Sequence, residues 1–464
     1  MSRRIAELGI AAGILVGAAA PAAAASAVSF QPEKAEGPPQ AARPNAETEA
    51  GAQTGAPEET GSPAAESTLF DDNRRAAREQ RFTINGRLET ELQDFNNFDL
   101  DDGERDDRVR ITPEARLEFG YRPNKDMLAF LSFEIGRDVE DVEGRRSTGR
   151  SRLELREAFI LWEDFVEDFE LQIGRQDFED SREWLFDERL DGVRLVYDEN
   201  DWEVTLAVAR EGLVRTDLLR RNSRRGTDNL LISAEREITD DLDAVGYYFR
   251  QQDRREGETR NFLGFQAEGE VGGGFDIWLD AAVLRGDDGR GKSLRGYALD
   301  AGVIYSLRAP GKPALILGYA HGSGGETSQV DRSFRQTGLQ DNEDRLSGLS
   351  NVKYYGELLD PELSNLSIIT AGIGFRPTEA SSLELIWHKY KQVDASDDEI
   401  RDSPLLAEPA GDDRSLGFEV DAIAAFRLAA GVGLEVKLGY FRPGEAFTRQ
   451  DDAKFAKARV VYRF

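Results

Sequence analysis

Apolar and polar side chains alternate along most of the chain from Arg81 to Phe464. In Phe275–Ala281 an apolar side chain stands at every second position, and Leu434–Tyr440 repeats the pattern in its clearest form. Alternation with a period of two predicts β-strands that have one apolar and one polar face. We expect eighteen such strands, most of them about 8–12 residues long, close to the length of a tilted strand that crosses a bilayer. They cover approximately residues 82–93, 110–121, 127–136, 152–162, 168–175, 189–197, 202–210, 228–237, 243–251, 260–270, 274–285, 295–306, 313–321, 367–376, 382–391, 414–427, 432–441 and 454–464.

The connections between the expected strands are of two kinds. Tight turns recur after every second strand, at Arg122–Asp126, Asp198–Asp201, Thr239–Leu242, Val271–Gly274, Pro377–Ser381 and Ala429–Gly431. The intervening loops are longer and highly charged, at Asp94–Val109, Arg137–Ser151, Glu211–Thr227, Gly322–Leu366 and Gln392–Asp413. Short periplasmic turns and long extracellular loops are typical of outer-membrane barrels. The sequence therefore predicts an all-β fold, a transmembrane antiparallel β-barrel of about 18 strands with long acidic extracellular loops. A soluble protein of repeated hairpins is the alternative.

Both ends of the chain favour export to the outer membrane. Residues 1–27 begin with Arg3 and Arg4, continue with an apolar stretch and end in small residues, which is the pattern of a secretory signal peptide. Residues 28–80 are rich in Ala, Pro and Glu, and we expect a disordered periplasmic tail. The last strand alternates up to the terminal Phe464, which resembles the signal read by the barrel assembly machinery. The barrel is thus expected to occupy residues 81–464.

Composition narrows the classes of function. The chain of 464 residues has a formal net charge of −29, no Cys and two His. The lack of Cys excludes disulfide scaffolds and thiolate sites, and the negative charge disfavours nucleic acid as a partner. No apolar run beyond the N-terminus is long enough for a helical membrane span.

Three segments resemble alginate-export-type outer-membrane proteins. They are Leu171–Phe178 with Arg189–Arg194 ("GRQ" and "DGVR"), Tyr354–Leu366, and Gly439–Phe447, and they occur in the family's order. The resemblance covers about residues 81–464. It implies a monomeric eighteen-stranded barrel that passes an acidic polysaccharide outward through an arginine-rich constriction. The matching candidates for substrate binding at the constriction are Arg175, Arg189, Asp191 and Arg194.

Periodicity adds three further candidates on the lumen-facing positions of strands, namely Arg156, Arg459 and Arg463. Guanidinium groups stay charged and pair bidentately with carboxylates, so they suit a carboxylated polymer. The alternative is that these Arg–Asp pairs only brace the barrel wall.

The expected function is passive passage of an anionic polysaccharide or related solute through the outer membrane of a Gram-negative cell. The alternatives are a general or substrate-specific uptake porin, a barrel enzyme, and a structural or adhesion barrel. His321 and His388 lack a surrounding nucleophile motif, so we expect no enzyme. Expected partners are outer-membrane lipid and lipopolysaccharide, and the assembly machinery through Phe464. No cofactor is expected beyond Ca²⁺ bound loosely at acidic loops such as Asp99–Glu104.

Overall fold

The computed structural model describes residues 81–104, 107–220 and 226–464. The expected signal peptide (1–27) and tail (28–80) lie outside the described residues. Within the described part all regular structure is β-strand, and none of it forms a helix of the length and apolarity needed to span a membrane.

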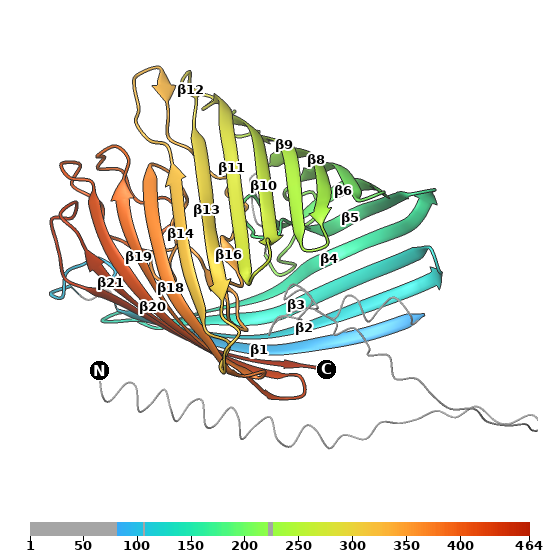
Figure 1. Ribbon diagram of the computed structural model, residues 1–464, viewed down its shortest axis with the longest axis horizontal. Helices are drawn as coiled ribbons and strands as arrows, with labels where there is room; N and C mark the ends of the chain where they lie inside the picture. The colour runs from blue at the N-terminus through green and yellow to red at the C-terminus, as the bar shows by residue number, and fades with distance from the viewer. Residues whose placement is uncertain (1–80, 105–106, 221–225) are drawn as a thin grey trace, which may run out of the picture. The chain divides into compact units, whose positions relative to one another are not determined.

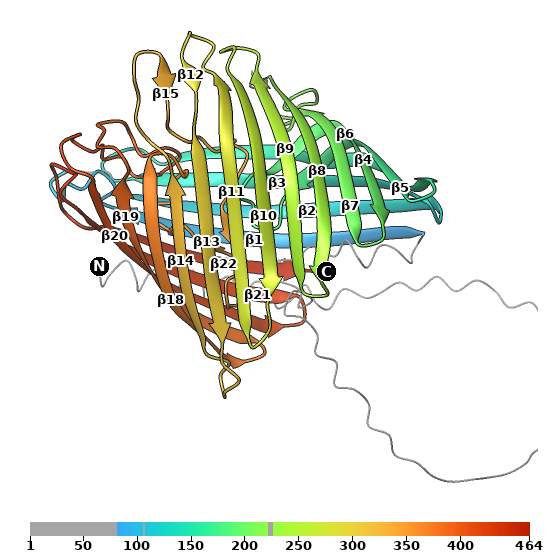
Figure 2. The same ribbon diagram turned by 45° about the horizontal axis from the view of Figure 1, so that its top comes forward.

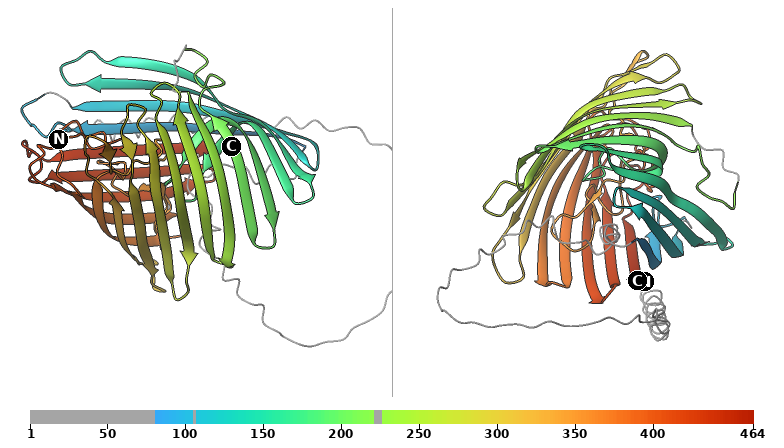
Figure 3. Two further views of the ribbon diagram at one scale, coloured as in Figure 1. Left: turned by 90° about the horizontal axis from the view of Figure 1, so that it is seen from above. Right: turned by 90° about the vertical axis from the view of Figure 1, so that its right-hand side faces the viewer.

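Eighteen strands of the described chain form a closed antiparallel barrel (Figure 1). Each pairs with its neighbours in chain order, and β1 closes the barrel against β22, from Arg87↔Arg463 to Asn96↔Lys454. Figure 3 shows the strands curving round into this wall. The wall strands are β1 (Phe82–Asn96), β2 (Arg108–Asn124), β3 (Met127–Val142), β4 (Thr148–Val166), β5 (Phe169–Glu179), β6 (Asp187–Glu199), β7 (Trp202–Arg210), β8 (Thr227–Thr239), β9 (Leu242–Asp253), β10 (Thr259–Glu270), β11 (Phe275–Asp287), β13 (Tyr297–Ser306), β14 (Ala314–Gly322), β18 (Leu366–Thr378), β19 (Ser381–Gln392), β20 (Ser415–Ala429), β21 (Val432–Pro443) and β22 (Ala453–Arg463).

Four short strands lie in the loops. β12 (Ser293–Leu294) and β15 (Val330–Asp331) pair in parallel and extend the sheet beyond the wall (Figure 2). β16 (Glu343–Asp344) and β17 (Val352–Lys353) form a separate two-stranded sheet.

The alternation expected from the sequence has the direction that a bilayer requires. Large apolar side chains such as Ile173, Leu206 and Leu317 are exposed on the outer face, whereas Glu134 and Lys437 are buried on the inner face. An exposed apolar belt of this extent is stable only against lipid. The eighteen expected strands are confirmed, and several extend farther toward the long loops than the alternation indicated.

The longest loop, residues 323–365 between β14 and β18, folds into the lumen. Its Leu346 and Val352 pack with the inward-facing Trp278, Ile304 and other apolar wall residues. Its Leu358, Leu359 and Leu363 are fully buried in a second cluster. Burial of these apolar side chains away from water is favourable, and the inner face of the barrel wall provides the surface that covers them. This loop therefore partly fills the lumen of the barrel.

The wall is completed by a loop at one place. β4 and β5 pair only between Ala158↔Arg175 and Val166↔Phe169. Beyond that point residues 213–219 of the β7–β8 loop, here called the strap, pair with β4: Leu155 N donates to Thr216 O (3.0 Å) and Leu218 N to Leu153 O (2.7 Å). At this point β5 no longer pairs with β4, and the strap forms backbone hydrogen bonds with β4 in place of β5.

Candidate pore constriction

The β5–β6 loop, residues 180–186, reaches across the lumen to the far wall. Its Arg182 is 2% exposed and lies among three carboxylates. Arg182 Nε is 3.1 Å from Asp280 Oδ2 on β11, Nη2 is 3.3 Å from Asp300 Oδ2 on β13, and Nη1 is 3.4 Å from Asp344 Oδ2 on β16. Its guanidinium also stacks over the rings of Trp278 (4.7 Å) and Tyr354 (4.4 Å). One cation thus anchors the loop to wall strands β11 and β13 and to the β14–β18 loop.

The electrostatics of this cluster follow from burial. Burial opposes the charge of Arg182, but Asp300 and Asp280 outweigh it and hold the pKa of Arg182 well above its ordinary value. Burial and the nearby Glu268 raise the pKa of Asp344 to about 7, against the opposing effect of Arg182.

The β5–β6 and β14–β18 loops are joined by hydrogen bonds along their length. Trp184 Nε1 donates to Tyr355 Oη (2.9 Å), and Tyr354 Oη donates to Arg182 O (3.0 Å). Gln336 Nε2 donates to Trp184 O (2.8 Å). Both loops therefore form one unit inside the lumen, which narrows the passage.

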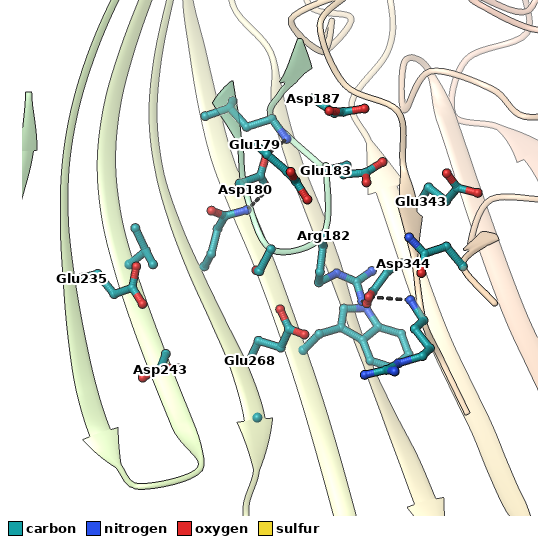
Figure 4. Close-up of a pocket in the computed structure, with 18 of the residues that line it drawn as sticks. Glu179, Asp180, Arg182, Glu183, Asp187, Glu235, Asp243, Glu268, Glu343 and Asp344 are labelled. Carbon is teal, nitrogen blue, oxygen red and sulfur yellow. Dashed lines mark hydrogen bonds and ion pairs between the residues drawn. The ribbon is translucent and has the colours of Figure 1, made fainter. Parts of the chain in front are cut away.

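Beside this unit lies a cavity of about 2020 Å³, whose lining is divided by charge. On β22, β1, β2 and β4 it contains four arginines, which we call the basic wall: Arg459, Arg87, Arg116 and Arg156. On β7 to β11 it contains carboxylates, which we call the acidic wall: Glu203, Glu235, Asp243, Glu268 and Asp276. Figure 4 shows Glu235, Asp243 and Glu268 beside the labelled residues of the two loops. A solute in the cavity therefore meets opposite charges on its two sides.

The arginines of the basic wall share their carboxylate partners. Glu89 pairs with both Arg87 and Arg459, the latter at 2.6 Å. Glu134 lies 3.2 Å from Arg116 and 3.4 Å from Arg156. These ion pairs fix the position of the four guanidinium groups on the wall of the cavity.

The structure separates the seven predicted candidates: four line the cavity, Arg175 and Asp191 pair inside the wall, and Arg463 does neither. Arg189, Arg194, Arg156 and Arg459 line the cavity. Arg189 Nη2 is 3.2 Å from Asp177 Oδ2, and Arg194 Nη1 donates to Asp177 O (3.3 Å). Arg463 lies opposite Arg87 at the β1–β22 closure and is not among the residues that line the cavity.

Arg175 and Asp191 lie together inside the wall. They lie on the same strand faces as the outward-facing Ile173 and Val193. Arg175 pairs with Asp191 (3.0 Å) and donates to Thr216 Oγ1 (2.7 Å) and Val214 O (3.0 Å) of the strap. Neither Arg175 nor Asp191 is among the described residues that line the cavity. Their geometry is that of a brace between the wall and the strap.

Sequence reasoning missed Arg182, Arg87 and Arg116. Arg87 and Arg116 occupy inward positions of two clearly alternating strands, so the rule that selected Arg459 would have found them. Arg182 lies in a loop, where strand periodicity gives no direction.

Comparison with known proteins adds three findings. A family model described as alginate export matches residues 65–461. The alginate production protein AlgE of Azotobacter vinelandii is 31% identical over 169 residues, which is 32% of this chain and 35% of that protein. AlgE of Pseudomonas aeruginosa is 28% identical over 185 residues, 36% of this chain and 37% of its own length. The matched region thus spans about a third of each curated relative.

Solved porin structures share the fold. Acinetobacter baumannii OccAB3 has a TM-score of 0.56 at 11% identity, covering 82% of this chain and 99% of its own. Pseudomonas aeruginosa OccK11 (OpdR) has a TM-score of 0.53 at 16% identity, covering 83% and 95%.

Proposed function

Because the chain belongs to the alginate export family, we propose that it forms a passive outer-membrane channel for an anionic, carboxylated polysaccharide. Family membership and the closed barrel support a channel. The observation that favours a carboxylated cargo is the basic wall, whose four arginines line one side of the cavity. Guanidinium groups bind carboxylates in a bidentate way, and the shared glutamates keep each contact weak enough for release.

The proposal includes the setting of the channel. Residues 1–27 direct export, the short turns face the periplasm, and Phe464 is the contact for the barrel assembly machinery. The barrel works as a monomer in lipid and lipopolysaccharide.

Planar-bilayer recording tests the cargo. We expect the wild-type channel to be blocked by soluble polyuronate oligomers. Charge reversal in the double variant Arg156→Glu/Arg459→Glu is expected to abolish that block and to lower the anion-to-cation permeability ratio several-fold. Arg254→Glu, on an exposed loop between β9 and β10, serves as the matched control and leaves both properties unchanged.

An uptake porin for small solutes is the second candidate. It is favoured by the acidic wall, because carboxylates outnumber cationic groups in the whole lining. Cation selectivity without polyuronate block in the wild-type channel would support it and would contradict the polysaccharide proposal.

We propose no catalytic role. His321 Nδ1 and Ser367 Oγ are 2.8 Å apart, on strands β14 and β18, so they are the residues to test. We expect the purified wild-type barrel and the Ser367→Ala variant to have the same background level of esterase activity.

A further inference from the structure

Three carboxylates from the two lumen loops converge at the constriction. Glu183 of the β5–β6 loop, Asp187 at the start of β6 and Asp341 of the β14–β18 loop have carboxylate oxygens that all lie within 4.8 Å of one another. Asp187 also belongs to a second such group, with Asp177 and Glu179. Figure 4 shows Glu179, Glu183 and Asp187 gathered at one edge of the cavity.

Backbone contacts hold these side chains together. Asp341 N and Asn342 N both donate to Glu183 O, at 3.2 and 3.1 Å, and Asp187 N donates to Leu339 O at 2.6 Å. The carboxylates therefore cannot move apart without undoing the junction between the two loops, although their like charges repel one another.

One carboxylate of each group has a cation beside it: Arg189 pairs with Asp177, and Lys353 pairs with Asp341. Glu183 is only 9% exposed, and its buried Oε2 has no hydrogen-bond partner within the described structure. A buried carboxylate oxygen without a partner is costly, and the Glu183 carboxylate has an oxygen within 4.8 Å of the Asp187 and Asp341 oxygens.

We propose that Glu183, Asp187 and Asp341 form a divalent-cation site that links the two constriction loops, with Ca²⁺ as the preferred ion. Carboxylate oxygens are the ligands of hard cations, and Ca²⁺ accepts irregular sets of six to eight oxygens. The spacing of up to 4.8 Å across separate loops suits Ca²⁺ better than the compact octahedron of Mg²⁺. The Asp341 side chain is 46% exposed to solvent, so water can complete the shell.

Isothermal titration calorimetry of the full-length barrel in detergent tests the site with CaCl₂. We expect saturable binding with a Kd of about 10⁻⁵ to 10⁻³ M. Glu183→Gln and Asp341→Asn are each expected to weaken binding by at least about tenfold. Asp101→Asn, in the outer acidic loop, is the matched control and leaves Kd unchanged.

Heat-modifiable gel mobility confirms that each variant is folded, and Asp341→Asn is the safer variant because Asp341 is exposed. Two results would overturn the site: no saturable Ca²⁺ binding by the wild type, or binding that Asp101→Asn weakens while Glu183→Gln and Asp341→Asn do not. The second result would place the ion in the outer loop.

Discussion

Arg182 shows how much of the constriction depends on one side chain. It is buried with Asp280, Asp300 and Asp344, and each carboxylate relies on it for compensation. Removing one member of a buried ionic group costs about 3–5 kcal/mol, because the remaining charges stay buried without compensation.

Arg182→Met is therefore expected to release the β5–β6 loop from the far wall while the barrel stays closed. Single-channel conductance should rise, and limited proteolysis should cut residues 180–186 faster than in the wild type. Arg290→Met, which breaks only an exposed pair with Glu256, is the control and should change neither. Unchanged conductance and cleavage in Arg182→Met would show that the loop does not depend on this cluster.

Asp344 makes the loop junction sensitive to pH. Its pKa is about 7 in the folded protein against an ordinary value of 3.8. A carboxyl whose pKa is raised by folding stabilises the fold below the unfolded pKa and loses that contribution as pH rises through the folded value. The contribution of Asp344 should thus decline between about pH 4 and pH 7 and level off above.

Thermal melting followed by tryptophan fluorescence at several pH values measures this effect. Asp344→Asn cannot ionise, so its stability relative to the wild type should increase from pH 4 to pH 7. A constant difference between the two proteins over that range would exclude the titration of Asp344.

At the scale of single residues, the sequence predicted inward arginines where a strand gave each side chain a direction. Arg156 and Arg459 line the cavity as the alternation indicated. Arg175 and Asp191 were selected by motif, and their strand parity points outward, toward the strap. Arg182 could not be predicted, since its direction depends on a loop that packs against residues more than ninety positions away.

At the scale of elements, the strands were predictable and the loops were not. Alternation fixed all eighteen wall strands because lipid and lumen impose opposite polarities on the two faces. The inward fold of the β14–β18 loop follows from its leucines, including the fully buried Leu349 and Leu358. An apolar content of that kind in a loop is a signal for burial, but the sequence does not say against which strands.

The brace between Arg175, Asp191 and the strap yields a prediction at this scale. Arg175→Met leaves Asp191 buried without its partner, so we expect a loss of about 3–5 kcal/mol in unfolding free energy. The double variant Arg175→Met/Asp191→Leu should recover most of it, since replacing a whole buried pair is often nearly neutral. Urea unfolding of the detergent-solubilised barrel measures both. A role in cargo selection would instead show as altered polyuronate block in the folded double variant.

At the scale of the whole molecule, the closure of the barrel involves its last residue. Gly86 N donates to Phe464 O (2.8 Å), and Phe464 N donates to Gly86 O (3.0 Å). The Phe464 ring covers Gly86, where a Cβ would collide with it. The terminal residue therefore completes the β1–β22 pairing.

Deletion of Phe464 removes both hydrogen bonds and the exposed aromatic ring, so the heat-modifiable folded fraction in isolated outer membranes should fall. Phe464→Tyr retains the backbone and the ring and is the control. If the deletion variant assembled as well as the wild type, neither closure nor recognition would require this residue.

The net charge of −29 describes the whole chain and does not show where the charged residues lie in the barrel. The cavity has a cluster of arginines on one side and a cluster of carboxylates on the other, so an average charge predicts neither the selectivity nor the path of a solute. Composition could exclude whole classes of protein, but it could not locate the charges.

The strap has a consequence for the order in which the barrel forms. Leu153 and Leu155 of β4 obtain their partners from Leu218 and Thr216, about sixty residues later in the chain. The edge of β4 therefore keeps unsatisfied backbone groups until the β7–β8 hairpin has formed and its loop has folded back. This part of the wall is therefore complete only after the strap has docked on β4, although β4 and β5 can pair before that.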